Sequence, residues 1–434
     1  MLDIDFVRKH PDIVKKAIAD KNIALDLDDF IALDDKRRQV IKNTDDLRRR
    51  QNEFNGKIVN LQGTEKQNAL DDIKSVSLNL KESEKELRVI EEKWGDMYAL
   101  VPNIASNDTP VGVDETANVE IEKWGDVPKF DFEAKSHIQL GCDLDIIDLE
   151  KGVNTSGFRG YYLKNEGAVL HLAVLNYALK KIIKNGFVPM ITPVIIKDFA
   201  LFGSGHFPFG KEDIYELANT GKDKSGINLG DKLYLAGTSE PSLLSYFATE
   251  ILDESELPKK VCGYSQCFRN EVGSYGKDTK GLYRIHEFSK VEQVVLCRAD
   301  EKESEQWLQK MRGYAQEILK ELGLPHRVLQ ICTGDMGAGK RKMYDIETWM
   351  PSRKGYGETH SDSDLTDWQT RRLNIKYKTK NGEKKYPYAL NNTVIASPRI
   401  LIAILENFQQ KDGSVKIPDP LVEFCGFDRI SPKK

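Results

Sequence analysis

Cysteine is scarce in this sequence and is not spaced as a metal site or a disulfide framework. Six Cys occur among 434 residues, and no two of them form a CxxC pair. Structural zinc sites and small disulfide scaffolds depend on regularly spaced cysteines, so the sequence argues against both. We expect free thiols in a reducing cytoplasm, and no zinc.

Long apolar runs and an excess of one charge are also absent from the sequence. The longest apolar run, Ile400–Leu405, has six residues, whereas a bilayer-spanning helix needs about 20. The first 16 residues are charged throughout and lack the apolar core of a signal peptide. Lys and Arg total 64 against 68 Asp and Glu, a net charge of −4. That balance excludes a globally basic surface but permits a local basic patch, and we expect a cytoplasmic protein without a membrane partner.

Residues 30–98 predict a helical hairpin. Apolar residues recur at every seventh position in two runs, separated by a break at residues 62–64. The first run is Leu33, Val40, Leu47, Phe54 and Leu61, and the second is Ile73, Leu80, Leu87 and Trp94. Such repeats in two adjacent segments are typical of an antiparallel coiled coil. Each helix would have about 30 residues and a length of roughly 45 Å. A hairpin of two such helices is too thin to bury a globular core.

The first predicted helix is rich in basic residues, among them Arg48, Arg49 and Arg50, which we call the arginine triplet. One interpretation is the ordinary solvated surface of a coiled coil. The alternative is a basic face that binds the phosphate backbone of a nucleic acid. Both interpretations are compatible with the sequence.

The composition changes after residue 102. Residues 103–135 are rich in Asp, Thr, Pro and Gly, and beyond residue 136 short β-rich runs alternate with helical stretches. This pattern predicts an α+β fold with a large antiparallel sheet flanked by helices. We therefore expect an arm domain over residues 1–110, a linker over 111–135 and a second, larger domain over 136–434.

One segment of the larger domain places charged and aromatic side chains together on strands. Arg269 and Glu271 are two positions apart and share a sheet face, as do Phe288, Lys290 and Glu292. A solvent-facing ladder of ion pairs, each worth about 0–1 kcal/mol, is the ordinary explanation. The functional alternative is a nucleotide site, in which Arg binds phosphate, the aromatic ring stacks on the base and carboxylates hold an amine.

A second segment runs from Glu358 to Arg399 and ends directly before an apolar, helix-like stretch. An Arg at the start of a helix is unfavourable for the helix dipole. An anion bound beside it would explain the choice, so Arg399 is a candidate phosphate-binding residue.

Together these segments resemble the class II aminoacyl-tRNA synthetases, and in particular the seryl-tRNA synthetase family. The stretches that look like the family's motifs 1, 2 and 3 and its serine loop are, respectively, residues 186–193, 268–292, 390–399 and 238–240. The predicted hairpin resembles the family's tRNA-binding arm. The resemblance covers essentially the whole chain in the family's order and spacing, and it implies the family's fold, an arm followed by an antiparallel catalytic sheet.

The resemblance implies an ATP site. The residues that it assigns to ATP are Arg269, Asn270, Glu271, Arg284, Ile285, Phe288, Glu358, Thr359, His360, Ser361 and Arg399. Arg269, Glu271 and Arg399 would be the catalytic residues, and Glu358 and Ser361 would hold Mg²⁺. These residue types suit a reaction that needs charge neutralisation and alignment but no protein nucleophile.

The resemblance also implies a pocket for L-serine. Its residues would be Thr238, Ser239, Glu240, Arg269, Glu292, Asn391 and Thr393. The ammonium group would meet Thr238, Glu240 and Glu292, and the hydroxyl group would meet Asn391 and Thr393.

Five positions depart from the family's common pattern, and one of them is Ser239, which stands where Ala is frequent. Asn392 and Pro398 stand where Gly is usual, and Asp362 and Asp364 stand where Cys and Asn are frequent. None of these departures removes a side chain that the resemblance assigns to a ligand.

The resemblance therefore predicts a serine–tRNA ligase that forms seryl-adenylate from L-serine and ATP. The seryl group would pass to the 3′ end of tRNA(Ser), and the sequence leaves open whether tRNA(Sec) is charged as well. The arm would bind the tRNA, with the arginine triplet as a candidate contact, and motif 1 implies a homodimer.

Rival functions are disfavoured by particular features of the sequence. A synthetase relative that activates an amino acid for a carrier protein would lack the long hairpin. A catalytically inactive paralogue would be expected to have lost residues such as Arg269, Glu292 or Arg399, and all three are present. The rarer zinc-dependent seryl enzyme is disfavoured by the shortage of Cys and His ligands.

Overall fold

The structure is a computed structural model that describes residues 1–58, 62–218, 221, 230, 232–272 and 280–433. The chain divides into two compact units, Met1–Pro102 and Asn103–Lys434. In the described part of the chain, none of the helices is long and apolar enough to cross a membrane.

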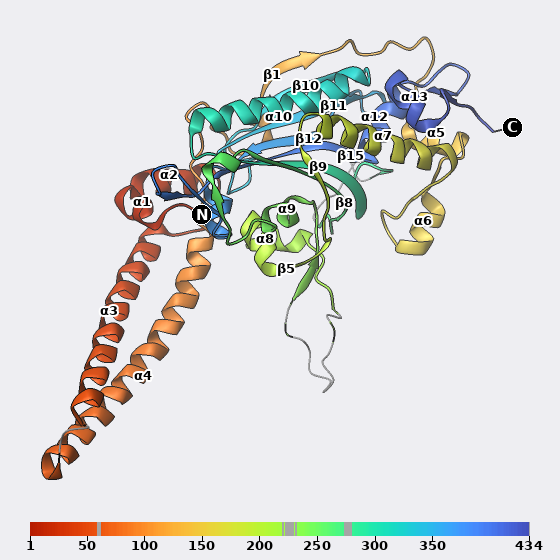
Figure 1. The fold of residues 1–434 in the computed structure, drawn as a ribbon. Coiled ribbons are helices and arrows are strands. Elements are labelled where there is room, and N and C mark those ends of the chain that lie inside the picture. Colours follow the sequence, from red (N-terminus) through yellow and green to blue (C-terminus); the bar gives the residue numbers. More distant parts are fainter. Residues whose placement is uncertain (59–61, 219–220, 222–229, 231, 273–279, 434) are drawn as a thin grey trace. The chain divides into compact units, whose positions relative to one another are not determined.

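The N-terminal unit consists of two short helices and a long helical hairpin (Figure 1). The helices are α1 (Ile4–Lys9), α2 (Pro11–Asp20), α3 (Leu27–Ile58) and α4 (Gly63–Ala99). α3 and α4 run antiparallel, which confirms the hairpin predicted from the heptad repeats. Leu61, the last residue of the first predicted run, lies outside the described residues.

Polar side chains occupy part of the contact between α3 and α4. Thr44 Oγ1 lies 2.7 Å from Ser83 Oγ, and Gln51 Nε2 donates to Ser77 Oγ at 2.8 Å. Buried polar contacts of this kind weaken a coiled coil but favour one alignment of its helices. The hairpin is thus held in register by hydrogen bonds as well as by apolar packing.

The C-terminal unit is built on an eight-stranded sheet with the order β1-β10-β11-β12-β15-β9-β8-β4. The bounds are β1 Val119–Trp124, β4 Val188–Ile191, β8 Lys259–Phe268, β9 Glu287–Cys297, β10 His326–Gln330, β11 Lys342–Met350, β12 Gly355–Asp364 and β15 Tyr388–Ser397. Neighbouring strands are antiparallel except for the parallel pair β4 and β8. The predicted α+β fold with a large antiparallel sheet is confirmed.

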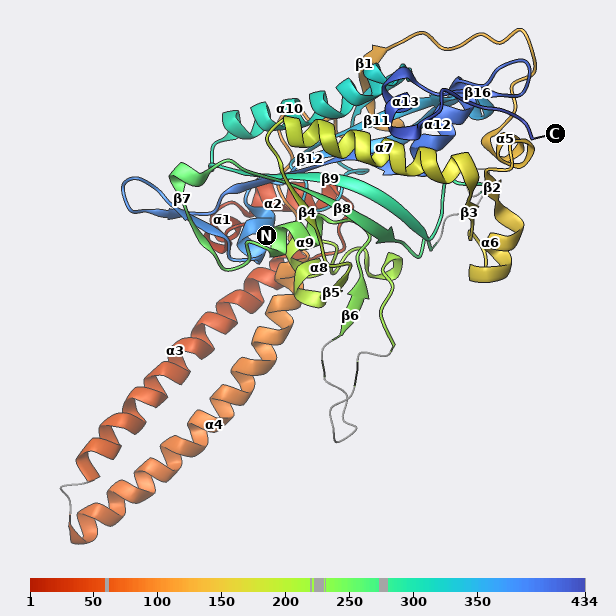
Figure 2. The same ribbon diagram turned by 45° about the vertical axis from the view of Figure 1, so that its right-hand side comes forward.

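Helices cover one face of this sheet and leave part of the other face open. α7 (Asn165–Lys184), α10 (Glu301–Glu321), α12 (Arg399–Asn407) and α13 (Asp419–Cys425) lie on one side (Figures 1 and 2). Their apolar side chains form the main core with the sheet. On the other side lie α8 (Asp198–Ser204), α9 (Glu240–Ser245) and α11 (Trp368–Arg372), and α9 packs on β8 and β9.

Short elements complete this unit. They are β2 Ile147–Asp148, β3 Tyr162–Leu163, β5 Ile195–Lys197, β6 Leu233–Leu235, β7 Ile251–Asp253, β13 Lys376–Lys378, β14 Lys384–Lys385, β16 Val415–Lys416, β17 Arg429–Ile430, α5 His137–Asp143 and α6 Leu149–Ser156.

The segment that was expected to be a linker, residues 111–135, contributes the edge strand β1, which pairs with β10. The sequence of β1, VEIEKW, alternates polar and apolar residues as a half-exposed strand does. It is short and flanked by Pro, Gly and Asp, so the composition of its surroundings concealed it.

Candidate active site

An irregularity in β12 brings Glu358 and Ser361 to one face of the sheet. On a regular strand, side chains three positions apart point to opposite faces. Here β11 pairs Asp345 with Ser361 and Glu347 with Glu358, with a register shift between these pairs. The extra residue, Thr359, forms a bulge, so both Glu358 and Ser361 face the same cavity.

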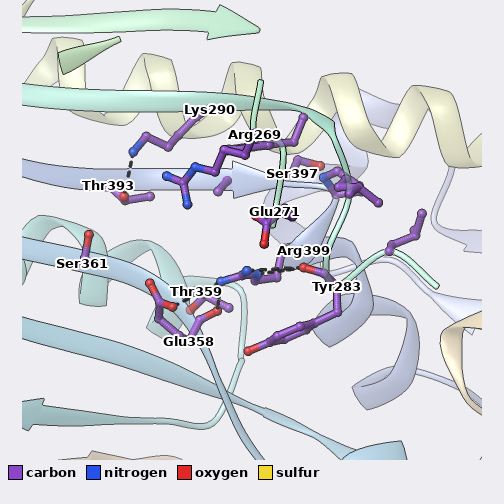
Figure 3. A pocket seen from close by; sticks show the side chains of 15 residues that line it. Arg269, Glu271, Tyr283, Lys290, Glu358, Thr359, Ser361, Thr393, Ser397 and Arg399 are labelled. Carbon is purple, nitrogen blue, oxygen red and sulfur yellow. Dashed lines mark hydrogen bonds and ion pairs between the residues drawn. The ribbon is translucent and has the colours of Figure 1, made fainter. Parts of the chain in front are cut away.

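This cavity lies on the open face of the sheet and is lined from the loop after β8, from β9, β12 and β15, and from the start of α12 (Figure 3). Its lining residues are Arg269, Glu271, Leu282, Tyr283, Ile285, Phe288, Lys290, Glu358, Thr359, Ser361, Thr393, Ala396, Ser397, Pro398 and Arg399. The residues that the resemblance assigned to ATP all belong to this set except Asn270, Arg284 and His360.

Two guanidinium groups lie in the cavity against aromatic rings. Arg269 Cζ is 5.3 Å from the centre of the Phe288 ring, and Arg399 Cζ is 4.4 Å from that of Tyr283. Arg399 Nη1 also donates to the backbone oxygen of Glu358 at 2.8 Å, whereas its distance to the Glu358 carboxylate is 3.5 Å. Arg399 Nε and Nη2 also lie 3.4 and 3.3 Å from the backbone oxygen of Tyr283, whereas the hydrogen bond of Arg269 to the described residues is made by Nε alone. A bound anion would therefore meet mainly the outer nitrogens of Arg269.

Glu271 is held as a carboxylate by a neighbouring cation. Arg284 Nη1 lies 2.8 Å from Glu271 Oε2. Burial by itself would raise the pKa of Glu271, but the Arg284 guanidinium holds that pKa below its ordinary value. Arg284 thus meets a carboxylate in this structure, whereas the resemblance assigned it to the outer phosphates of ATP.

Glu240 stands at the start of α9, where it accepts two side-chain hydrogen bonds. Asn391 Nδ2 donates to it at 2.9 Å and Gln369 Nε2 at 2.6 Å. Burial raises the pKa of this carboxyl, and the hydrogen bond from Gln369 opposes the rise. The helix approaches β8 closely because Gly263 has no side chain: a Cβ there would lie 2.7 Å from Ser239 Oγ.

Glu292 is only 2% exposed and contacts Lys290 on the same strand. Thr393 Oγ1, on the neighbouring strand, lies 3.4 Å from Glu292 Oε2. Burial raises the pKa of the Glu292 carboxyl, the Lys290 ammonium lowers it and the charge of Glu240 raises it again. Nearby, the buried hydroxyl of Thr238 has no hydrogen-bond partner among the described residues.

Three residues assigned by the resemblance point away from the cavity. Ser239 Oγ donates to the backbone oxygen of Gly263, and Asn270 Nδ2 donates to a backbone oxygen at 3.4 Å. His360 lies on the core side of β12, where its Nε2 contacts the oxygen of Val394, and burial lowers its pKa to about 3. Residues 273–279 of the predicted motif 2 loop lie outside the described residues.

Lys290, Tyr283 and Gln369 belong to the site but were not assigned by sequence reasoning. For Lys290 the signal was present, because it alternates with Phe288 and Glu292 on one strand face. Tyr283 contributes an aromatic ring and Gln369 a side-chain amide, and the spacing of neither residue in the sequence predicts that it belongs to the site.

Glu358 and Ser361 offer oxygen ligands of the kind that Mg²⁺ prefers. Across the ladder from Ser361, Asp345 has a buried carboxylate oxygen, Oδ1, with no hydrogen-bond partner in the described structure. Burial and the charge of Glu358 raise the pKa of Asp345. Within the described ranges, no group of three or more His, Cys, Asp or Glu side chains is arranged to hold a metal ion. A hard cation here would need oxygens from a substrate as well.

Comparisons with known proteins identify the family of this chain. Residues 1–105 match the model of the seryl-tRNA synthetase N-terminal domain, and residues 224–408 match that of the tRNA synthetase class II core domain (G, H, P, S and T). The Serine–tRNA ligases of Borrelia garinii and Deinococcus radiodurans are 42% and 43% identical to this chain, and each alignment covers at least 98% of both proteins.

Solved structures show the same relationship. The seryl-tRNA synthetase of Pyrococcus horikoshii complexed with ATP has a TM-score of 0.88 and 35% identity, and the alignment covers 100% of both chains. The cytoplasmic Serine-tRNA ligase of Naegleria fowleri in complex with AMP has a TM-score of 0.84 and 29% identity, over 100% of this chain and 99% of the other. The chain belongs to the seryl-tRNA synthetase family, whose catalytic core is that of the class II aminoacyl-tRNA synthetases.

Proposed function

We propose that this chain ligates L-serine to tRNA(Ser) in two steps that consume ATP. The observation that carries the proposal is a cavity lined by two arginines, Arg269 and Arg399, next to which the buried carboxylate of Glu292 feels the charges of both Arg269 and a second carboxylate, Glu240. An arginine pair suits a nucleotide's phosphates, and the carboxylate pair suits an ammonium group. A zwitterionic amino acid and a nucleotide can therefore meet there.

In the first step, a carboxylate oxygen of serine attacks the α-phosphorus of ATP. A new O–P bond forms, the bond to the bridging oxygen of the β-phosphate breaks, and pyrophosphate leaves. Arg269 neutralises the charge on the α-phosphate, and Arg399 neutralises the outer phosphates and covers the base opposite Phe288. Glu271 accepts a hydrogen bond from the adenine amine. The protein thus contributes alignment and electrostatic stabilisation, and no side chain becomes covalently attached.

The amino acid is selected by the polar groups around it. The ammonium group binds Glu240, Glu292 and the partnerless hydroxyl of Thr238, and the serine hydroxyl binds Asn391 and Thr393. Asn391 and Thr393 already bond Glu240 and Glu292, so alanine would leave only their remaining hydrogen-bonding capacity unused, which still costs free energy in a buried site.

Mg²⁺ would be held by the oxygens of Glu358 and Ser361 together with substrate phosphates, as is usual for this ion. It supplies charge neutralisation and orientation of the phosphates. The oxygen-only donor set and the partnerless oxygen of Asp345 on the same face fit such an ion.

In the second step, a hydroxyl of the tRNA's terminal ribose attacks the seryl carbonyl, and AMP leaves. The hairpin of α3 and α4 binds the tRNA. Within the arginine triplet, Arg48 pairs with Glu84 at 2.9 Å and Arg49 with Asp46 at 3.0 Å. Arg50 has no ion pair within the described part of the chain, so it is the member of the triplet best placed to meet a phosphate.

The active form is a homodimer that works in the cytoplasm. β4 lies at the edge of the sheet, and together with α7 it presents an apolar groove of about 580 Å³. Ile191 is 90% exposed, and Leu172 and Val188 are more than half exposed. A large solvent-exposed apolar surface at the edge of a sheet is unfavourable for a monomer. A second copy of this chain would cover it. Ile191→Asp should shift the mass measured by light scattering from dimer to monomer.

Serine-dependent exchange between ATP and labelled pyrophosphate tests the first step without tRNA. Charging of tRNA(Ser) and tRNA(Sec) transcripts tests the second and shows whether both are substrates. Exchange supported by another amino acid in preference to serine, or no exchange at all, would contradict the proposal.

A further inference from the structure

Lys290 is a buried lysine in the active-site cavity, and family resemblance assigned it no role. It is 6% exposed and lies on β9 between Phe288 and Glu292 on the face that lines the cavity. Its two cross-strand neighbours, Ser265 on β8 and Ala396 on β15, have small side chains. The lysine stem therefore has room to lie along the sheet toward Glu292.

The Lys290 ammonium contacts both proposed serine ligands at this end of the cavity. Its Nζ forms an ion pair with Glu292 Oε2 and lies 3.3 Å from Thr393 Oγ1, the contact drawn in Figure 3. Lys290 and Thr393, the described hydrogen-bond partners of the Glu292 carboxylate, both meet Oε2 rather than Oε1. One carboxylate oxygen is thus bound internally, and one is left for a ligand.

A buried ion pair of this kind contributes little to the stability of the folded protein. Removing two charges from water costs more than their attraction usually returns, and apolar replacements of such pairs are often neutral or stabilising. Two carboxylates in one pocket, Glu240 and Glu292, also disfavour each other's ionisation. Without an internal cation, one of them would take up a proton and could no longer bind an ammonium group as a charged partner.

We propose that Lys290 is a positioning residue for the amino-acid substrate, which keeps Glu292 ionised and oriented while the site is empty, so that Glu292 Oε1 is ready for the substrate's ammonium group. The inference rests on the proposed function of the cavity. It adds the requirement that the pocket supply its own counter-ion before serine arrives. With Arg269 beside the substrate carboxylate, the charges of two glutamates, two cations and a zwitterion then sum to zero.

The charged groups around Glu292 decide what pH dependence to expect. They are Lys290 on β9, Glu240 at the start of α9 and Arg269 after β8, while Thr393 of β15 is uncharged. His206, after α8, feels the charges of Lys290 and Arg269, but burial lowers its pKa to about 4. Its titration therefore does not fall in the neutral range, and a slope in serine affinity between about pH 6 and about pH 8.5 would come from the carboxylate pair of Glu240 and Glu292. A Glu292→Gln background distinguishes between the two.

The test is the pH profile of serine-dependent pyrophosphate exchange in Lys290→Met and Lys290→Gln. In the parent enzyme the KM for serine should be flat between about pH 6 and about pH 8.5, since Glu292 stays ionised. Both neutral variants should show a serine KM raised at least ~10-fold at the acid end, falling toward the parent value as pH rises, because each pH unit below a raised pKa costs up to tenfold. The KM for ATP and kcat at saturating serine should change little.

Two further variants make the outcome specific. Lys260→Met removes a lysine from the opposite face of the same sheet, where its amine lies over Phe187 and Trp307, and should leave the serine profile flat. In a Glu292→Gln background, Lys290→Met should add no pH slope, because the titrating group is gone.

The idea is overturned if either neutral variant keeps the parent serine KM, or if that KM rises equally at all pH values, which would indicate a purely structural role. A fall in kcat that is equal at all pH values would instead indicate that Lys290 contacts the reacting groups, and it would also overturn the proposal. These failures differ from a failure of the proposed function, in which the parent enzyme itself shows no serine-dependent exchange.

Discussion

Replacement of Arg269 by Ala separates the chemical role of this side chain from its structural one. In the structure Arg269 has few internal contacts: Nε lies 3.4 Å from the oxygen of Gly237, and the guanidinium lies over Phe288. A long hydrogen bond and a partly exposed cation–π contact contribute on the order of 1 kcal/mol each at most. The variant should therefore fold.

The loss in rate should be larger than the loss in stability. If Arg269 stabilises the charge that develops on the α-phosphate, its removal should slow adenylate formation by at least ~100-fold, equivalent to about 2.7 kcal/mol, the size found for loss of one transition-state donor. Arg269→Lys keeps the charge but loses the planar fork, and it should recover only part of the rate.

The assay is serine-dependent pyrophosphate exchange beside urea unfolding of the same preparations. Arg298→Ala is a matched control, since Arg298 directly follows β9 and pairs with Glu303 on the surface, and it should retain exchange. A folded Arg269→Ala enzyme with near-normal exchange would refute the role, as would a loss of stability large enough to explain the loss of rate.

Thr393→Val keeps the volume of the side chain but removes its hydroxyl, so the preference for serine over alanine in exchange should fall while the KM for ATP stays nearly constant; an unchanged preference would make Thr393 structural. Deletion of residues 30–98 should leave exchange intact and abolish tRNA charging, whereas normal charging would make the hairpin a spacer. Gln at all three positions of the arginine triplet should lower the salt dependence of tRNA binding by roughly one unit of slope for each phosphate that is no longer bound, and a full slope would place the phosphate-binding residues elsewhere. Glu406, which is fully buried and accepts hydrogen bonds from His137, has its pKa lowered by these bonds against the effect of burial. It should therefore stabilise the fold above about pH 4.3, where an unfolded Glu is ionised, and less as pH falls. Glu406→Gln should flatten that acid slope in urea unfolding, and an unaltered slope would assign it to other groups.

The arm and the fold class were predictable because their signals are periodic. Heptads required only counting, and alternating β-rich and helical stretches indicated the sheet. The polar contacts of Thr44 and Gln51 were not predictable, because a hydroxyl or amide in a helix sequence looks the same whether it faces solvent or a partner helix. β1 was missed for a related reason, since six residues of weak alternation were outweighed by the Pro and Gly around them.

The candidate site was predictable as far as family motifs reach. Resemblance assigned Arg269, Phe288 and Arg399 to ATP, and the structure brings them to one cavity; their roles stay predictions until the variants are assayed. Resemblance did not reveal that Arg284 pairs with Glu271, because that depends on how a loop returns to the sheet. Nor did it assign Lys290, whose meaning depends on the carboxylate that it contacts.

The bulge in β12 has a consequence for which changes the site can tolerate. Side chains on a regular strand point to alternate faces of the sheet. One extra residue reverses this alternation for every residue after it. Deleting Thr359 would remove the bulge and leave Glu358 and Ser361 two positions apart on a regular ladder, so both would still point to the same face. Straightening the strand without that deletion would leave the two residues three positions apart and turn one of them away from the cavity. Along these residues, therefore, loss of the bulge and loss of one residue should occur together, and selection should act against either change alone.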